Sequence, residues 1–191
     1  MFERYTEKAR RIIFFARYEA SQFGSHGIEP EHLLLALFRE ARAALDALGV
    51  PTNLEEELRS TAPASGEKIS TSVDLPLSHS AKRVLAYGAE EAEALSSKYI
   101  APEHLLLGIL RESGTHAELL LRKHGVTIAP VREKLIQRGI DLTGAPEQTS
   151  AHSANKKIVS ALRDTFAPIA SRLVAETEPA VTFILKPGAA A

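Results

Sequence analysis

Apolar residues recur at helical spacing in two separate stretches of this chain. In the first stretch, Ile12, Ile13, Ala16 and Ala20 share one face of a helix, because they stand about one and two turns apart. Thr6 stands just before this stripe, where an N-cap residue belongs. The second stretch repeats the arrangement 72 residues further on, with Ser78 as the cap before Val84, Leu85, Gly88 and Ala92. The pattern predicts two equivalent amphipathic helices.

Each stripe is followed by a second predicted helix that begins with the same six residues, PEHLLL at 30–35 and at 102–107. The surrounding segments, IEPEHLLLALFRE and IAPEHLLLGILRE, agree at 9 of 13 positions, which identifies an internal repeat. A proline suits the first turn of a helix, and the leucines after it form an apolar face. Gly49 and Gly125 suit the residue after a helix end. Further short helices are predicted at 43–48, 52–60, 116–124 and 127–138.

Stretches rich in proline, serine and glycine divide the chain. The predicted parts are a first repeat at 1–62, a linker at 63–76, a second repeat at 77–139, and a linker and tail at 140–191. In the tail, apolar residues at helical spacing around Pro168 predict a kinked amphipathic helix, and AVTFILKP has the character of a short strand. Because that apolar stripe needs cover, we hypothesise that residues 154–186 pack back on the repeats.

Composition excludes several classes of function. The chain of 191 residues has no cysteine, which excludes disulfides and thiolate chemistry and fits a reducing compartment, so a cytoplasmic location is expected. No segment approaches the roughly 18 to 20 apolar residues of a membrane span, and the charged N-terminus lacks the apolar core of a signal peptide. A formal net charge of -1 gives no global attraction to nucleic acid or to a membrane surface.

The repeated Glu31 and Glu103 are the main candidates for chemistry. Near a helix N-terminus a carboxylate is favoured by the macrodipole, but the same helix end also binds anions, so a structural role and a ligand-binding role both remain open. Catalysis is disfavoured, since repeat symmetry should give both carboxylates the same environment, whereas acid–base pairs need different pKa values. His32 and His104 lack the converging ligands of a metal site, and packing or a hydrogen bond to the preceding loop is expected instead.

Two further groups of side chains recur or cluster. Arg11 and Arg83 are expected to pair with Glu19 and Glu91 across helical turns, or with neighbouring carbonyl groups. The first predicted helix and the residues before it carry more aromatic rings than one buried face can hold. These rings could form an apolar partner surface or pack against the second repeat or the tail. The candidates for that surface are Phe2, Tyr5, Phe14 and Phe15.

The FERYTEKARR start, the PEHLLL…RE segment and the GV close of each copy resemble the N-terminal domain of the Clp unfoldases, above all the ClpC type. The resemblance covers residues 1 to about 139. It implies an eight-helix bundle of two four-helix repeats about a pseudo-twofold axis. It also implies recognition of phosphorylated arginine by Glu31 and Glu103, with which Thr6 and Ser78 are grouped as candidate ligand-binding residues. ClpC-type domains usually carry Gly-Thr before the Glu-His pair, whereas this chain has Glu29-Pro30 and Ala101-Pro102.

The resemblance implies a docking module that acts by binding protein segments. No GxxxxGK[ST] phosphate loop occurs, so we expect a stand-alone module without the AAA+ motor, without catalytic residues and without a cofactor. The predicted role is that of an adaptor or regulator of substrate recruitment to a Clp unfoldase–protease. The alternative is a regulator that binds only the unfoldase or its adaptors. Expected partners are Clp substrates or adaptors, a Clp AAA+ unfoldase and phosphoarginine-marked proteins, but neither nucleic acid nor membranes.

Overall fold

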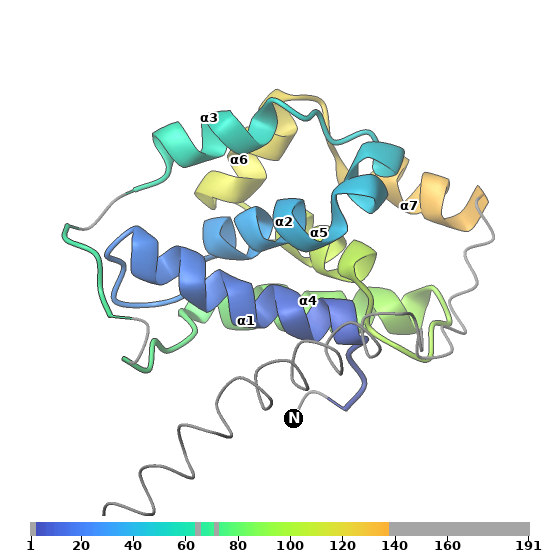
Figure 1. The fold of residues 1–191 in the computed structure, drawn as a ribbon. Helices are drawn as coiled ribbons and strands as arrows, with labels where there is room; N and C mark the ends of the chain where they lie inside the picture. The colour runs from blue at the N-terminus through green and yellow to red at the C-terminus, as the bar shows by residue number, and fades with distance from the viewer. Residues whose placement is uncertain (1–2, 64–65, 71–72, 138–191) are drawn as a thin grey trace, which may run out of the picture. The chain divides into compact units, whose positions relative to one another are not determined.

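The computed structural model describes residues 3–63, 66–70 and 73–137, and over these ranges the chain forms seven helices and no strand (Figure 1). The all-α prediction is therefore confirmed. The tail helix and short strand predicted beyond residue 139, and the packing of the tail on the repeats, lie outside the described residues. The helices are α1 (Glu7–Gln22), α2 (Pro30–Leu48), α3 (Leu54–Thr61), α4 (His79–Ala94), α5 (Pro102–Arg111), α6 (His116–Lys123) and α7 (Ile128–Gln137).

The first helix of each repeat begins where the sequence places its cap. The Thr6 hydroxyl accepts a hydrogen bond from the Ala9 backbone N–H at 3.2 Å, and the Ser78 hydroxyl accepts one from the Ala81 N–H at 3.0 Å. Each bond satisfies one of the N–H groups that a helix leaves without a partner in its first turn. The predicted apolar stripes of both helices lie in the core, except that Ile13 is only half-buried and packs against it.

The second helix differs between the repeats. In the first repeat α2 continues through a kink at Ala41 (φ −134°, ψ 28°), so the helix predicted at 43–48 is the last part of α2. In the second repeat α5 ends at Arg111, and α6 starts separately after Gly114 (φ +82°). The four extra residues of the second copy fall in this connection. The described part of the chain therefore has seven separate helices where the resemblance implied eight.

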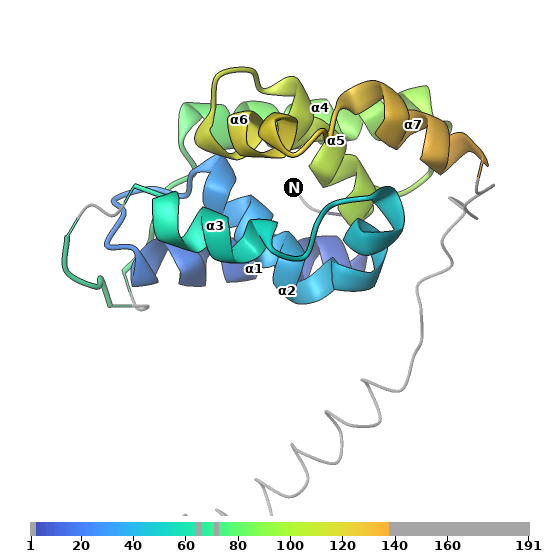
Figure 2. The ribbon, with the colours of Figure 1, turned by 90° about the horizontal axis from the view of Figure 1, so that it is seen from above.

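Backbone hydrogen bonds join the start of each first helix to a loop of the other repeat. The Thr6 N–H donates to the Ile100 carbonyl oxygen at 3.0 Å, and the Ser78 N–H donates to the Ile28 carbonyl oxygen at 3.0 Å. Thr6 and Ser78 are equivalent in the two copies, as are Ile28 and Ile100. The approach to each first helix is thus held by the loop before the second helix of the other repeat. Figure 2 shows α1–α3 on one side of the bundle and α4–α7 on the other.

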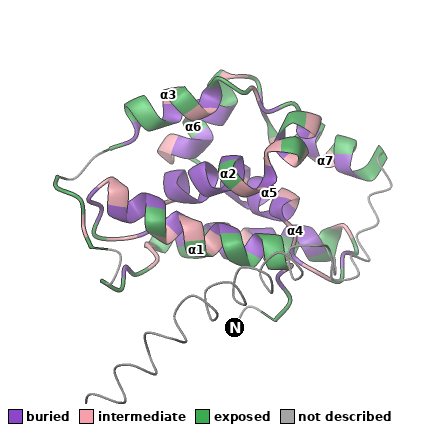
Figure 3. Cartoon of the chain, viewed as in Figure 1, coloured by how far each residue is buried: buried purple, intermediate pink, exposed green. Residues whose placement is uncertain are grey.

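The helices α2 and α5 form the centre of the core. Both are apolar on nearly every side after the first turn, which suits a helix surrounded by others. Figure 3 shows their buried residues between the outer helices. Eight large apolar side chains of the two helices have no exposed surface: Leu33, Leu34, Leu35, Leu37, Leu105, Leu106, Leu107 and Ile109.

The helices α4 and α5 approach each other more closely than a side chain allows. A Cβ atom added at Gly108 would lie 2.3 Å from the Val84 carbonyl oxygen, and one added at Gly88 would lie 3.1 Å from the His104 carbonyl oxygen. The first repeat has alanines at both equivalent positions. The second repeat therefore packs its first two helices backbone against backbone.

The described helices offer neither a membrane span nor a cluster of metal ligands. None of the helices in these ranges combines the length and hydropathy that a membrane crossing needs. No group of three or more His, Asp or Glu side chains within the same ranges could hold a metal ion.

Candidate binding site at the two PEHLLL helix starts

The two histidines of the repeated motif cap the N-termini of α2 and α5. The His32 Nδ1 atom accepts a hydrogen bond from the Glu29 backbone N–H at 3.0 Å, and the His104 Nδ1 atom accepts one from the Ala101 N–H at 2.9 Å. Each imidazole thus takes the place of the Glu or Gln side chain that reaches back to the N-cap residue in a capping box. The predicted hydrogen bond to the preceding loop is confirmed.

Both histidines are neutral in the folded protein. Their residues are 1% and 0% exposed, and this burial lowers the pKa of each imidazole from 6.5 to about 4, against a smaller opposite effect of Glu19 on His32 and of Glu91 on His104. Since Nδ1 accepts a hydrogen bond, the proton of the neutral ring must sit on Nε2. Among the described residues, neither buried Nε2 atom has a hydrogen-bond partner.

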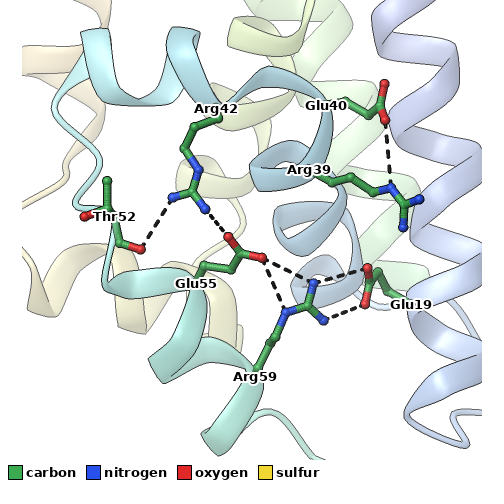
Figure 4. Close-up of polar contacts among 7 residues, drawn as sticks. All are labelled: Glu19, Arg39, Glu40, Arg42, Thr52, Glu55 and Arg59. Carbon is green, nitrogen blue, oxygen red and sulfur yellow. Dashed lines mark hydrogen bonds and ion pairs between the residues drawn. The ribbon is translucent and has the colours of Figure 1, made fainter.

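A buried glutamate acts electrostatically on each histidine, Glu19 on His32 and Glu91 on His104, and both glutamates are bound by arginines. Arg59 of α3 donates to both oxygens of Glu19, at 2.8 and 3.3 Å (Figure 4). Burial would raise the pKa of Glu91, but the hydrogen bonds and charges of Arg132 and Arg111 outweigh it, so that the pKa is lowered. These ion pairs tie α3 to α1 and α7 to α4, the first helices of the two repeats.

The expected pairing of Arg11 and Arg83 with Glu19 and Glu91 is wrong. Arg11 instead contacts Glu40 at 2.9 Å, and the Arg83 Nε atom donates to Glu112 at 2.9 Å. Eight residues along a helix span about 12 Å, so partners on the neighbouring helix are closer than those two turns away on the same helix.

Glu31 and Glu103 do not have the same environment, although repeat symmetry predicted that they would. Glu31 is only 7% exposed, whereas Glu103 is half-buried. Burial raises the pKa of the Glu31 carboxyl; Glu29 also raises it, while its own backbone N–H and the imidazole of His116 lower it. One of the neighbours of Glu31, His116 at the start of α6, comes from the second repeat.

Each motif lies next to the N-cap of a helix from the other repeat. The bond from the Thr6 N–H to Ile100 places the start of α1 beside the loop that leads into Glu103. The bond from the Ser78 N–H to Ile28 does the same for α4 and the loop before Glu31. Two helix N-termini, each with a partial positive charge, therefore meet near each glutamate.

The four aromatic candidates separate in the structure. Tyr5 is only 8% exposed and forms a bridge with Ile100, so it belongs to the contact between repeats and not to an exposed surface. Phe2 lies outside the described residues. Phe15 is half-buried and packs against the core, while Phe14 is 67% exposed.

Sequence reasoning missed an open hollow between α3 and α6. It has a volume of about 250 Å³. Lys123 donates to Glu57 across it at 2.6 Å, and the Thr61 hydroxyl lies 3.0 Å from His116 Nε2. Because one wall comes from each repeat, no signal within a single copy could have indicated it. The hollow is lined by Glu57, Thr61, His116, Leu119, Leu120 and Lys123.

Comparisons with known proteins show the family and the fold of this chain. The model of the Clp repeat (R) N-terminal domain matches residues 4–124. The negative regulator of genetic competence ClpC/MecB of Bacillus subtilis is 32% identical over 176 residues, which are 89% of this chain and 21% of that protein. The chloroplastic chaperone protein ClpC1 of Arabidopsis thaliana is 36% identical over 142 residues, which are 72% of this chain and 15% of that protein. The chain thus spans about a fifth or less of the length of these relatives.

Solved structures show the same fold. The N-terminal domain of the chaperone ClpD from Arabidopsis thaliana is 31% identical, with a TM-score of 0.58 over 72% of this chain and 96% of that one. The Hsp104 N-terminal domain from Candida albicans, 18% identical with a TM-score of 0.60 over 72% of this chain and 93% of that one, shares the fold. Family model, relatives and structure lead to one assignment: the chain belongs to the Clp repeat N-terminal domain family.

Proposed function

We propose that this chain is a protein-binding module of a Clp system, which acts as an adaptor or regulator of substrate recruitment to an ATP-dependent unfoldase–protease. The family membership supports a Clp-related role, and the relatives include an ATP-binding subunit of a Clp protease and a negative regulator. A cytoplasmic location, expected from the absence of cysteine in the sequence, is part of this proposal.

The observation that carries the proposal is the pairing of a carboxylate with two helix N-termini in each repeat. A phosphorylated arginine has a guanidinium group, which a carboxylate binds by charge-assisted hydrogen bonds, and a phosphoryl group, which suits the N–H groups of a helix start. Glu31 and Glu103 would bind the guanidinium group. Thr6 and Ser78 already accept a helix N–H, but each hydroxyl can still donate its own proton to a phosphoryl oxygen.

Two such sites on one domain would strengthen the binding of a substrate that carries two marks. Once one mark is bound, the second binds at a high effective concentration, and the overall affinity can exceed that of a single site by about a hundredfold or more. The pseudo-twofold arrangement therefore favours polypeptides marked at several positions over free phosphoarginine.

Isothermal titration calorimetry with free phosphoarginine tests the site. We expect saturable binding by the unchanged protein and at least about a tenfold loss in the Glu31→Gln, Glu103→Gln double variant, because Gln keeps the shape but removes the charge. Free arginine and inorganic phosphate serve as control ligands. Absence of binding, or equal affinity in the double variant, would leave both glutamates with a structural role at the helix start.

The burial of Glu31 favours a second candidate, a regulator that binds only the unfoldase or its adaptors. A side chain that is 7% exposed offers little surface to a substrate. Degradation of a marked substrate by a Clp unfoldase–protease separates the two roles. An adaptor accelerates degradation and also binds the substrate in a pull-down, whereas the pure regulator changes the rate without binding the substrate.

A further inference from the structure

The internal repeat supplies its own comparison for Arg39, the arginine that follows the PEHLLL leucines. Its equivalent in the second repeat, Arg111, is fully engaged within the domain. Arg111 contacts Glu90 at 2.7 Å and Glu91 at 3.1 Å, and its guanidinium lies 4.3 Å from the centre of the Tyr87 ring. In the second repeat, an arginine at this position is thus stacked on one ring and paired with two carboxylates.

Arg39 keeps the stacking but lacks the carboxylates. Its guanidinium lies 4.0 Å from the centre of the Phe15 ring and 5.5 Å from that of Tyr18. Tyr18 stands where the second repeat has Glu90, and Glu19, the equivalent of Glu91, is bound to Arg59. Figure 4 shows Glu19 bound to Arg59, with Arg39 apart from this pair and joined only to Glu40 among the residues drawn.

The nearest carboxylate to Arg39 is itself already paired. Among the described residues, the shortest ion-pair contact of Arg39 joins its Nε atom to Glu40 at 4.0 Å, and Glu40 contacts Arg11 at 2.9 Å. The Arg39 side chain is 45% exposed. With two arginines and one glutamate, this surface carries a net positive charge. The geometry leaves the Arg39 guanidinium free to pair with an external carboxylate.

An exposed apolar surface adjoins this arginine. Phe14 is 67% exposed and meets Phe15 edge to face, with ring centres 5.4 Å apart, and Tyr18 is 40% exposed. The second repeat has Ala86 at the position of Phe14, so the feature belongs to the first repeat alone. We call Phe14, Phe15, Tyr18 and Arg39 the aromatic–arginine patch.

We propose that the aromatic–arginine patch docks an acidic peptide segment of a partner protein. One carboxylate of that segment would take the position on Arg39 that Glu90 takes on Arg111, and a neighbouring apolar side chain would cover Phe14. The positive charge at this surface selects the acidic partner, and rings beside an arginine are the composition of binding hot spots. This surface is distinct from the two PEHLLL helix starts and adds a second contact to the proposed function.

Fluorescence anisotropy with a labelled peptide of sequence Asp-Glu-Leu-Phe-Asp-Glu-Leu tests the proposal. One control peptide carries Asn and Gln in place of the acidic residues, and another carries Ser in place of Leu and Phe. We expect both control peptides to bind at least about tenfold more weakly than the acidic peptide. Equal binding of the acidic and amide peptides would overturn the proposal.

The decisive variant is Tyr18→Glu, which gives Arg39 the carboxylate that Arg111 has in the second repeat. This variant should fold, because the second repeat already has glutamate at the equivalent position 90. Its affinity for the peptide should fall about tenfold, because the introduced carboxylate would pair with Arg39 in place of the peptide. Tyr18→Phe is the matched control and should bind as the unchanged protein does. If Tyr18→Glu fails to fold, the substitution Phe14→Ala at an exposed position tests the patch instead. It should also weaken peptide binding, and unchanged binding would overturn the proposal.

Two further results separate this inference from the proposed function. Peptide binding should persist in the Glu31→Gln, Glu103→Gln variant and should not be displaced by free phosphoarginine. Loss of peptide binding in that variant would overturn the separate site. Sedimentation should show a monomer; a dimer that Tyr18→Glu dissociates would mean that a second copy occupies the patch, and it would also overturn the proposal.

Discussion

Lowering the pH is expected to destabilise the domain through His32 and His104. Each imidazole is buried and accepts a backbone N–H at Nδ1, so a proton added to that atom would break the cap of α2 or α5. The folded protein therefore resists protonation, and the pKa of each ring falls from 6.5 to about 4. In the unfolded chain nothing opposes protonation.

The size of the effect follows from this difference in pKa. As the pH falls through 6.5, the unfolded chain takes up two protons that the folded chain binds only near pH 4. The stabilisation by neutral histidine is thus fully present above pH 6.5 and is lost as the pH falls toward about 4. A difference of about 2.5 pKa units, at about 1.36 kcal/mol per unit, amounts to about 3 kcal/mol for each ring. Two rings together approach the whole stability of a typical domain, about 5–15 kcal/mol.

Carboxyl groups with shifted pKa values also contribute to the pH dependence. The lowered pKa values of Glu91 and Glu112 mean that their stabilising contributions are lost below pH 4.5. The raised pKa of Glu31 has the opposite sign, because the folded protein takes up this proton more readily, and it offsets part of the loss. Between pH 6.5 and 4.5 the loss caused by the two histidines is therefore opposed by Glu31, and a variant without the two histidines isolates their part.

Urea unfolding followed by far-ultraviolet circular dichroism at a series of pH values measures this effect. The free energy of unfolding should fall by up to about 2.7 kcal/mol per pH unit where both histidines differ in protonation. The His32→Gln, His104→Gln variant should lose most of this slope, since Gln can accept the N-cap N–H without titrating. His79→Gln, at an exposed position, is the matched control and should keep the slope. A flat profile in the unchanged protein, or an unchanged slope in the double variant, would refute the reasoning.

Two further predictions concern the close packing of α4 on α5 and the buried ion pair of Glu19. Gly108→Ala should lower the free energy of unfolding by about 1–3 kcal/mol, because its Cβ would meet the Val84 carbonyl oxygen at 2.3 Å, although alanine by itself favours a helix by about 1 kcal/mol. Gly88→Ala should lower it less, because its closest contact is longer. Equal stability of both variants and the unchanged protein in urea unfolding would contradict the close approach of the two helices. Arg59→Ala should lower the free energy of unfolding by about 2 kcal/mol, because it leaves the Glu19 carboxylate buried without the guanidinium that binds it. Adding Glu19→Gln to this variant should restore much of the lost stability in thermal unfolding. If it restores none, the unpaired charge is not the cause of the loss.

The features that the sequence determined by itself are local or periodic. Thr6 and Ser78 cap their helices as predicted, since an N-cap bond joins residues only three positions apart. Gly49 (φ +90°) and Gly125 (φ +75°) follow helix ends in the left-handed conformation, as predicted. The buried stripes follow from helical spacing, and the repeated PEHLLL segment identified the two central helices and the histidines that cap them.

Tertiary structure decided everything that depends on contacts between helices or between repeats. Arg11 pairs with Glu40 on the neighbouring helix and not with Glu19 on its own, and Tyr5 is buried by its bridge to the other repeat. Glu31 is more buried than Glu103, although both stand in the same six residues. An alignment of two copies shows which residues are equivalent, but it does not show which residues of the other copy surround them. The burial and charge of each site are set by those surroundings, because a side chain responds to the neighbours that packing brings to it and not to its place in a motif.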